Sequence, residues 1–185
     1  MRTRKITIGI TGPESSGKSA LAKFLARKFH AFLVPEFARS YLEQTDGVYS
    51  YSDLLEIAMG QKKHFEDGLK SRKSVIVSDT DLTVIKIWSE HKYRKVDEHL
   101  MTLYERERMD LYLLCKPDLI WKDDPLRESP NNRDELFDLY LKDLTDRKLN
   151  YLIISGKSSE RKRLASEAVR KLVSEKMDDD NLLSL

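Results

Sequence analysis

The sequence predicts an α/β fold in which a doubly wound, five-stranded parallel sheet carries helices on both faces. Five short apolar runs alternate with helical patterns along the 185 residues, which is the order of repeated strand–helix–strand units. The runs are apolar throughout, as in strands that are covered on both faces. A loop containing glycine and serine joins the first run to the first helical pattern. Together these features indicate one α/β sandwich.

The strands are expected at the apolar runs and the helices at the segments between them. The runs are residues 5–10, 31–34, 74–78, 111–115 and 151–154. The helical patterns are residues 19–29, 52–71, 82–91, 97–107, 133–146 and 158–176. No linker or internal repeat divides the chain, so residues 1–176 are expected to form a single domain. The acidic end, residues 177–185, is expected to fray.

Composition narrows the classes of partner. Charged residues make up 35% of the chain, and 33 basic against 31 acidic residues give a net charge of +2, which argues against a nucleic-acid binder. Cys115 is the single cysteine, so an internal disulfide is ruled out. The apolar run after the basic N-terminus is too short for a signal peptide or a membrane span. We therefore expect a cytoplasmic protein that binds neither membrane nor nucleic acid; its oligomeric state is left open.

Residues 12–19 carry the most informative motif. They read Gly-Pro-Glu-Ser-Ser-Gly-Lys-Ser and match the phosphate-binding pattern G-x-x-x-x-G-K-S/T in full, between a predicted strand and a predicted helix. Lys18 is expected to reach the β- and γ-phosphates of a nucleotide, and the Ser19 hydroxyl to ligate Mg²⁺. A Gly/Ser turn without a ligand is the alternative. The residues expected to bind ATP in this segment are Gly12, Glu14, Ser15, Ser16, Gly17, Lys18, Ser19 and Ala20.

Acidic residues follow two of the other predicted strands. Asp79 and Asp81 end the third run, at the strand edge where open α/β sheets bind their ligands. Asp79 is expected to hold a Mg²⁺ water or to accept a proton from an attacking hydroxyl. Asp81 is expected to contact the substrate, with capping of the following helix as an alternative that is compatible with it. Glu36 follows the second run at the same edge, with a place in the first turn of a helix as its alternative.

Basic and aromatic residues near this edge are further candidates. Arg39 is expected either to pair with Glu36 at helical spacing or to bind the substrate. The polar segment 121–133 resembles a mobile lid, in which Arg127 and Arg133 would close on phosphate groups; an ordinary surface loop is the alternative. Residues 122–133 are expected to be poorly ordered or open without nucleotide. The remaining candidates are Gly156 as part of the purine site, and Phe37 and Trp88 for stacking on a base or for core packing.

Taken in order, these motifs resemble a known family. The segments are GPESSGKS at 12–19, EFAR at 36–39, DTD at 79–81 and WKDDPLR at 121–127. The chain resembles the ribosylnicotinamide kinase domain of the NadR-type bifunctional NAD-biosynthesis proteins over roughly residues 6–175. The resemblance implies a nucleoside- and nucleotide-kinase-like fold and ATP-dependent phosphorylation of the 5′-hydroxyl of nicotinamide riboside. It also implies that Glu36 and Asp79 act around that hydroxyl and that Arg127 belongs to the lid.

The chain departs from this family in three places. The residues before the kinase part are too few for an adenylyltransferase domain, so we expect a separate adenylyltransferase to act on the product. Pro35 stands where bifunctional members carry a tryptophan before the glutamate, which leaves the base of the acceptor open. Pro125 replaces the glycine of the usual Asp-Gly-Leu-Arg lid, which indicates a stiffer lid.

The function that we predict from these residues is a small-molecule kinase using ATP and Mg²⁺. Lys18 and Arg127 would stabilise charge on the transferring phosphoryl group, and Glu36 or Asp79 would accept the proton of the acceptor hydroxyl. Nicotinamide riboside is the preferred acceptor, and another nucleoside or a nucleotide is the alternative. A regulatory ATP-binding NTPase is the rival from another class, but it would need only a group that positions water.

Overall fold

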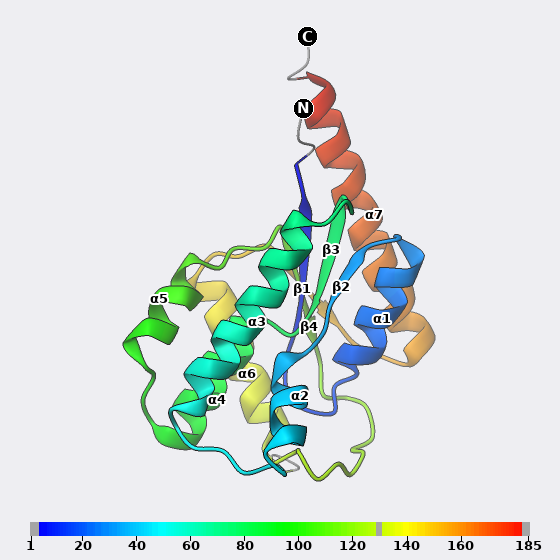
Figure 1. Cartoon of the computed structure of the whole chain (residues 1–185). Coiled ribbons are helices and arrows are strands. Elements are labelled where there is room, and N and C mark those ends of the chain that lie inside the picture. Colours follow the sequence, from blue (N-terminus) through cyan, green and yellow to red (C-terminus); the bar gives the residue numbers. More distant parts are fainter. Residues whose placement is uncertain (1–3, 129–130, 183–185) are drawn as a thin grey trace.

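The computed structural model describes residues 4–128 and 131–182. A five-stranded parallel sheet has the order β2-β3-β1-β4-β5 (Figure 1), which confirms the predicted fold class. Because the chain crosses from one side of β1 to the other between β3 and β4, the carboxyl ends of these strands form a switch point of the kind where α/β sheets bind ligands. The strands are β1 (Ile6–Thr11), β2 (Phe32–Val34), β3 (Val75–Asp79), β4 (Leu111–Cys115) and β5 (Tyr151–Ile154).

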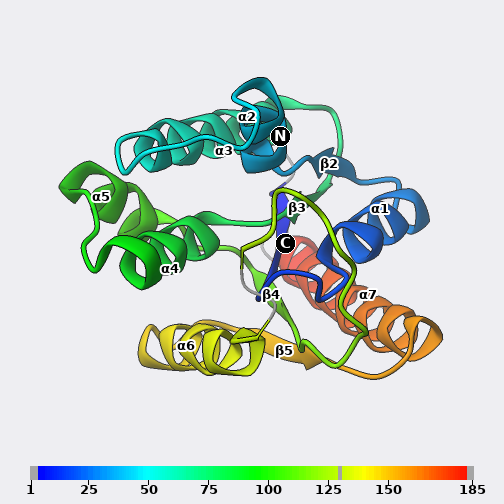
Figure 2. The ribbon, with the colours of Figure 1, turned by 90° about the horizontal axis from the view of Figure 1, so that it is seen from below.

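Helices cover both faces of this sheet. Seen along the strands, α1 and α7 lie on one side, and α4, α5 and α6 lie on the other (Figure 2). Helix α3 packs beside α4 on the second side, and α2 lies against α3. The bounds of the helices are α1 (Lys18–Lys28), α2 (Phe37–Gln44), α3 (Asp53–Lys70), α4 (Leu82–Tyr93), α5 (Glu98–Arg106), α6 (Arg133–Asp146) and α7 (Ser158–Leu182).

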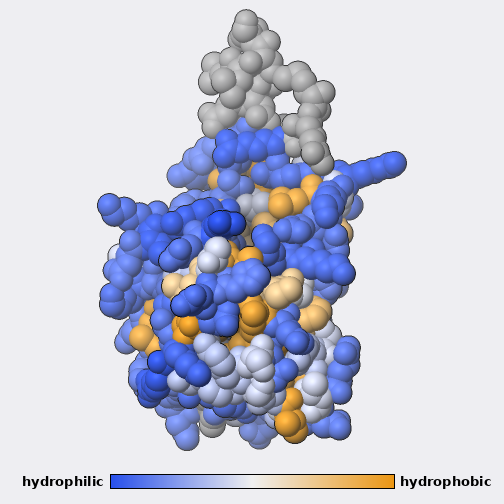
Figure 3. All heavy atoms as spheres, turned by 60° about the vertical axis from the view of Figure 1, so that its left-hand side comes forward, coloured by the Kyte–Doolittle hydropathy of each residue, from blue (hydrophilic) through white to orange (hydrophobic). Residues whose placement is uncertain are grey.

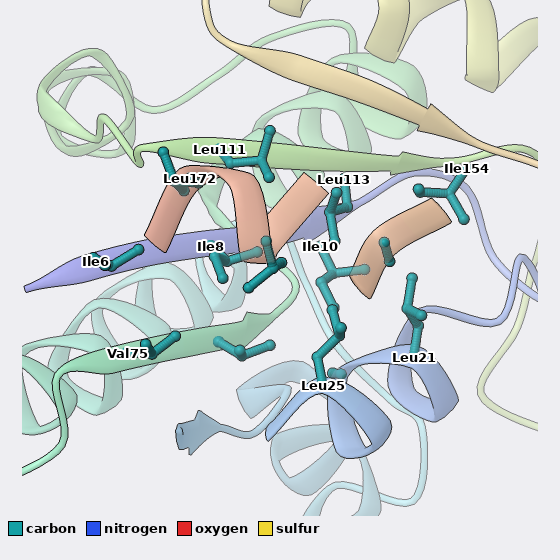
Figure 4. Close-up of a cluster of buried hydrophobic side chains, with 14 of the residues drawn as sticks. Ile6, Ile8, Ile10, Leu21, Leu25, Val75, Leu111, Leu113, Ile154 and Leu172 are labelled. Carbon is teal, nitrogen blue, oxygen red and sulfur yellow. The ribbon is translucent and has the colours of Figure 1, made fainter. Parts of the chain in front are cut away.

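Alternate residues of the central strands enter two separate cores. Ile8 and Ile10 of β1 are fully buried and point toward Leu25 of α1 and the helix α7 (Figure 4). On β4, Leu113 joins this core, whereas the buried Tyr112 faces the opposite core between α4 and α6. Successive side chains of a strand point to opposite faces, so a strand between two helical layers needs apolar residues at every position.

The outer surface agrees with the charged composition. In the view of Figure 3 the surface is mostly hydrophilic, and hydrophobic residues show as small separate patches. None of the helices that the structure describes is both long and apolar enough to cross a bilayer.

Two segments differ from the sequence-based expectation. Helix α2 begins at Phe37, two residues after β2, in a segment that is not among the expected helical patterns and where a helix start was only the alternative for Glu36. Helix α7 continues to Leu182 and does not end at Lys176, so residues 177–182 are helical. That the acidic end frays stays a prediction. No glycine or proline interrupts residues 158–182, and so nothing in the backbone stops this helix. Residues 183–185 lie outside the described residues, and the single domain at 1–176 stays a prediction.

The contact between α2 and α3 depends on a missing side chain. A Cβ placed on Gly60 of α3 would lie 2.2 Å from Cε1 of Phe37. Gly→Ala in a helix ordinarily stabilises by about 1 kcal/mol. We expect Gly60→Ala to destabilise by about 1–3 kcal/mol in urea unfolding, because the ring must move. Adding Phe37→Leu should recover part of this loss; a Gly60→Ala protein as stable as the parent would show that the ring does not occupy this notch.

Candidate active site

A cavity of about 650 Å³ opens at the carboxyl ends of the strands. Its walls come from the loop after β1, the start of α2, helices α4 and α6, and the loop after β4. Figure 2 looks onto this end of the sheet, where the loop between β4 and α6 passes over the strands. Elements that are far apart in the sequence therefore meet around one space.

The loop at residues 12–17 is tightly folded at the floor of this cavity. Gly12 has φ 126°, and a Cβ there would lie 2.6 Å from the carbonyl oxygen of Cys115, so no other residue fits without a shift. The Ser16 hydroxyl donates to the Pro13 carbonyl at 2.7 Å and closes the turn. Lys18 Nζ donates to the carbonyls of Gly12 and Pro13, at 2.7 Å each, and so lies over the hollow of the loop.

The start of α1 is suited to an anion. Its N-cap residue is Gly17, which has no side chain to cap the helix, and the first turn holds no acidic residue. The N–H groups and the positive end of the helix dipole are then unopposed at this end. This is the usual arrangement for binding phosphate oxygens.

Asp79 ends β3 beside this loop and is 5% exposed. Burial raises the pKa of Asp79 to about 6, and the negative charge of Glu36 adds to the rise. The hydroxyl of Ser19 and the ammonium of Lys18 lower the pKa in part. Among the described residues, Oδ1 of Asp79 is a buried atom without a hydrogen-bond partner. A buried carboxylate oxygen of this kind, next to a hydroxyl, fits a hard cation such as Mg²⁺.

The backbone turns sharply between the two acids of the DTD segment. Thr80 has φ 72°, an unusual and strained value for a β-branched residue, and its carbonyl accepts a hydrogen bond from the Ser78 hydroxyl at 2.6 Å. The turn sends Asp81 into the interior, where it is 0% exposed. Its Oδ1 accepts from the Thr11 hydroxyl at 2.9 Å and from the Val84 N–H at 3.3 Å, which caps α4. The capping alternative is confirmed. A contact between Asp81 and substrate stays a prediction, and Asp81 is not among the residues that line the cavity.

Glu36 lies at the cavity wall as the N-cap residue of α2. Its side chain makes no capping bond to the start of this helix. Arg39 comes within 4.0 Å of Glu36, but its short contact is with Asp124, at 2.8 Å. Arg39 therefore ties α2 to the loop after β4, a pairing that the sequence spacing did not indicate.

Gln61 links the two segments that carry Glu36 and Asp79, and the sequence did not predict this role. It lies on α3 and is 2% exposed. Its Oε1 accepts from the Phe37 N–H at 2.8 Å, and its Nε2 donates to the Ser78 hydroxyl at 3.3 Å and to the Asp79 carbonyl at 3.5 Å. The amide thus holds the start of α2 against the end of β3. A glutamine in an amphipathic helix gives no signal for this role.

The described part of the loop after β4 rests on the loop after β1. The Lys122 N–H donates to the Ser15 hydroxyl at 3.0 Å, and the Glu128 N–H donates to Glu14 Oε2 at 3.0 Å. Residues 129–130 of the expected lid lie outside the described residues. Disorder of residues 122–133 without nucleotide stays a prediction.

The basic and aromatic candidates divide between the cavity and its surroundings. Arg127 and Trp88 line the cavity, and Trp88 Nε1 donates to the Tyr49 hydroxyl at 2.9 Å. The Arg133 guanidinium donates to the Leu119 carbonyl at 3.1 Å and does not line the cavity. Two other candidates also lie outside the walls: the Phe37 ring packs against His64, and the Gly156 N–H donates to Asp118 Oδ2 at 2.7 Å. Arg133, Gly156 and Phe37 therefore contact neighbouring residues and do not line the cavity.

Comparisons with known proteins agree with this geometry. A family model described as an AAA domain matches residues 7–162. The chain belongs to this AAA domain family. Trifunctional NAD biosynthesis/regulator protein NadR of Escherichia coli (strain K12) is 27% identical over 176 residues, which are 91% of this chain and 43% of that protein. The Salmonella typhimurium protein of the same name is 29% identical over 132 residues, 69% of this chain and 32% of that protein. The chain spans less than half the length of these relatives.

Solved structures of other proteins have the same fold as this chain. NadR protein in complex with NAD and AMP-PNP matches with a TM-score of 0.78 at 22% identity, over 91% of this chain and 49% of that one. NadR protein in complex with NR matches with the same TM-score at 21% identity, over 91% and 50%. Thymidylate kinase from Ehrlichia chaffeensis matches with a TM-score of 0.59 at 16% identity, over 91% and 99%. The chain therefore has a P-loop, nucleoside-kinase-like fold and is homologous to NadR.

Asp81 and Glu107 form a second pair of carboxyl groups, and both accept hydrogen bonds at the start of α4. Glu107 Oε2 accepts from the Leu82 N–H at 2.9 Å, at the start of α4 that Asp81 caps. Burial, and then the charge of Asp81, raise the pKa of Glu107 from 4.5 to about 8. The folded chain therefore holds a proton on Glu107 to higher pH than the unfolded chain does.

This difference predicts how stability changes with pH. Between pH 4.5 and about 8 the folded state binds more protons at Glu107 than the unfolded state, so the free energy of unfolding should fall as pH rises through this window. Glu107→Gln should flatten the fall in urea unfolding measured across it, and the exposed neighbour Glu105→Gln should leave the fall unchanged. An equal slope in the parent and Glu107→Gln would place the protonation elsewhere.

Proposed function

We propose that this chain is an ATP-dependent kinase that transfers the γ-phosphoryl group to the 5′-hydroxyl of a nucleoside. Nicotinamide riboside is the preferred acceptor, and nicotinamide mononucleotide is then the product. Homology to NadR and the P-loop, kinase-like fold support a phosphotransferase. The observation that carries the proposal is that Glu36 and Lys18 line one cavity, and that Asp79, at the end of β3, lies close enough to both for their charges to act on its carboxyl group.

The residues of the chain have separate tasks in such a transfer. The N–H groups at the start of α1 and the Lys18 ammonium bind the phosphates and offset the charge that develops on the transferring group. Ser19 and Asp79 would hold Mg²⁺ together with phosphate oxygens and water, and the bound ion would neutralise phosphate charge. In the described residues no group of three or more His, Cys, Asp or Glu side chains could hold a metal ion.

The acceptor side needs a base and a cover. The acceptor oxygen forms a bond to the γ-phosphorus as the bond to the β-phosphate oxygen breaks, and the hydroxyl proton passes to the Glu36 carboxylate. Arg127 lines the cavity and would contact the transferring group, and the loop that carries it would cover the site against water. An adenylyltransferase would consume the product, because a mononucleotide is the substrate of that reaction.

The test is ADP release by the purified protein with ATP and Mg²⁺ across a panel of nucleosides and nucleotides. Release should rise severalfold or more with nicotinamide riboside, because the acceptor completes the closed site. Lys18→Ala should lower the rate by several orders of magnitude. Lys28→Ala, at the far end of α1, is the matched control and should keep the parent rate.

Two outcomes would contradict the proposal. ADP release that no acceptor changes would favour the regulatory NTPase. A larger response to another nucleoside or nucleotide would keep the kinase but replace the acceptor.

Amide variants should separate the two acids. Glu36→Gln should lower turnover by about 10²–10⁴-fold at every Mg²⁺ concentration, since the amide cannot accept a proton. Asp79→Asn should be partly restored by added Mg²⁺, because this carboxylate serves the ion. Glu43→Gln, on the exposed side of α2, is the control and should match the parent. Equal Mg²⁺ titrations of the Glu36 and Asp79 variants would contradict this division of roles.

A further inference from the structure

Arg161, in the first turns of α7, makes a buried set of contacts that the transfer chemistry does not use. The residue is 4% exposed. Its Nε donates to the Gly156 carbonyl at 2.8 Å, and its Nη1 donates to the Ser16 carbonyl at 2.8 Å. Its Nη2 donates to the Lys116 carbonyl at 2.7 Å and also to Asp118 Oδ1. One guanidinium therefore satisfies four oxygen atoms.

These four acceptors belong to three separate segments. Ser16 lies in the phosphate loop after β1, Lys116 and Asp118 follow β4, and Gly156 follows β5. Asp118 closes the set, because its second oxygen accepts from the Gly156 N–H at 2.7 Å. Only a planar group with five fixed donors can serve acceptors in these several directions at once.

The segment after β4 also forms a wall of the cavity. Leu119 and Ile120 line it, and Ile120 is 89% exposed, which is unusual for a large apolar side chain. Ser158, at the start of α7, lines the same space. Flat apolar surface beside a phosphate site is suited to a nucleobase. Both oxygens of Asp118 are already bonded within the chain, so this acid is not available to a base.

We propose that Arg161 is a positioning residue that fixes the nucleobase side of the cavity relative to the phosphate loop. The ligand class is a nucleoside triphosphate, so this inference rests on the nucleotide binding in the proposed function, but not on the acceptor. Arg161 touches no ligand itself. It sets the distance between the wall at 119–120 and the phosphate loop, so that the base and the phosphates of one molecule bind together.

The test compares two probes in calorimetric titrations with Mg²⁺: AMP-PNP and inorganic tripolyphosphate. The ratio of their dissociation constants measures what the nucleoside part adds to binding. Arg161→Lys keeps the charge but leaves some of the four acceptors unbonded, so the ratio should shrink about tenfold or more. Asp118→Asn removes the charged partner and should shrink the ratio in the same direction. It serves as the second variant if Arg161→Lys does not fold.

Arg147→Lys is the matched control. The Arg147 side chain is only 12% exposed, donates to two backbone carbonyls, those of Tyr104 and Glu107, and lies near an aspartate. Its hydrogen bonds go to the end of α5 and not to the phosphate loop, and it lies outside the cavity wall. It should lose stability and keep the ratio. A folded Arg161 or Asp118 variant with the parent ratio would overturn the inference, and so would a control that loses the ratio equally. A parent protein that binds neither probe would overturn the proposed function as well.

Discussion

The register between β1 and β3 is the constraint on which the site depends. Ile10 pairs with Asp79 across these parallel strands, so β3 ends in its acid at the level where β1 passes into the phosphate loop. On the other side Thr11 pairs with Leu114, which brings the end of β4 under Gly12. Register in a sheet covered on both faces is strongly specified, because a slip of one residue would exchange the two cores. The apolar packing of the strands thereby places the polar chemistry.

Beyond the strand ends, polar side chains hold the loops. Gln61 joins the start of α2 to the end of β3, and Arg161 joins three loops on the other half of the edge. Each satisfies backbone groups that leave the sheet with no strand or helix partner nearby. Such bonds add only about 1 kcal/mol apiece, but a missing partner costs more, so they fix conformation more than they add stability. An edge built in this way can keep a large cavity open without collapsing into it.

The sequence was sufficient for the features that follow from local pattern. The apolar runs predicted all five strands, and residues 12–19 predicted the loop and the helix after it. The sequence pattern did not predict side-chain positions that depend on backbone geometry or on partners far away in the sequence. In an extended strand Asp79 and Asp81 would share one face, but the left-handed backbone of Thr80 turns them apart. Gln61 and Arg161 carry no local signal at all, because their partners lie on other elements and are mostly backbone atoms.

At the carboxyl edge of the sheet, the loops on the phosphate side and the loop on the acceptor side are held by different contacts. This difference bears on the proposed transfer reaction. On the proposed nucleotide side, the buried Arg161 holds the phosphate loop and the loops after β4 and β5 together. The acceptor half is joined to the covering loop through the partly exposed pair of Arg39 and Asp124. Exposed pairs contribute little to stability and break readily, whereas a buried guanidinium with four acceptors does not. In the proposed transfer, we therefore expect the phosphate loop to stay rigid while the loop that carries Asp124 opens and closes over the acceptor.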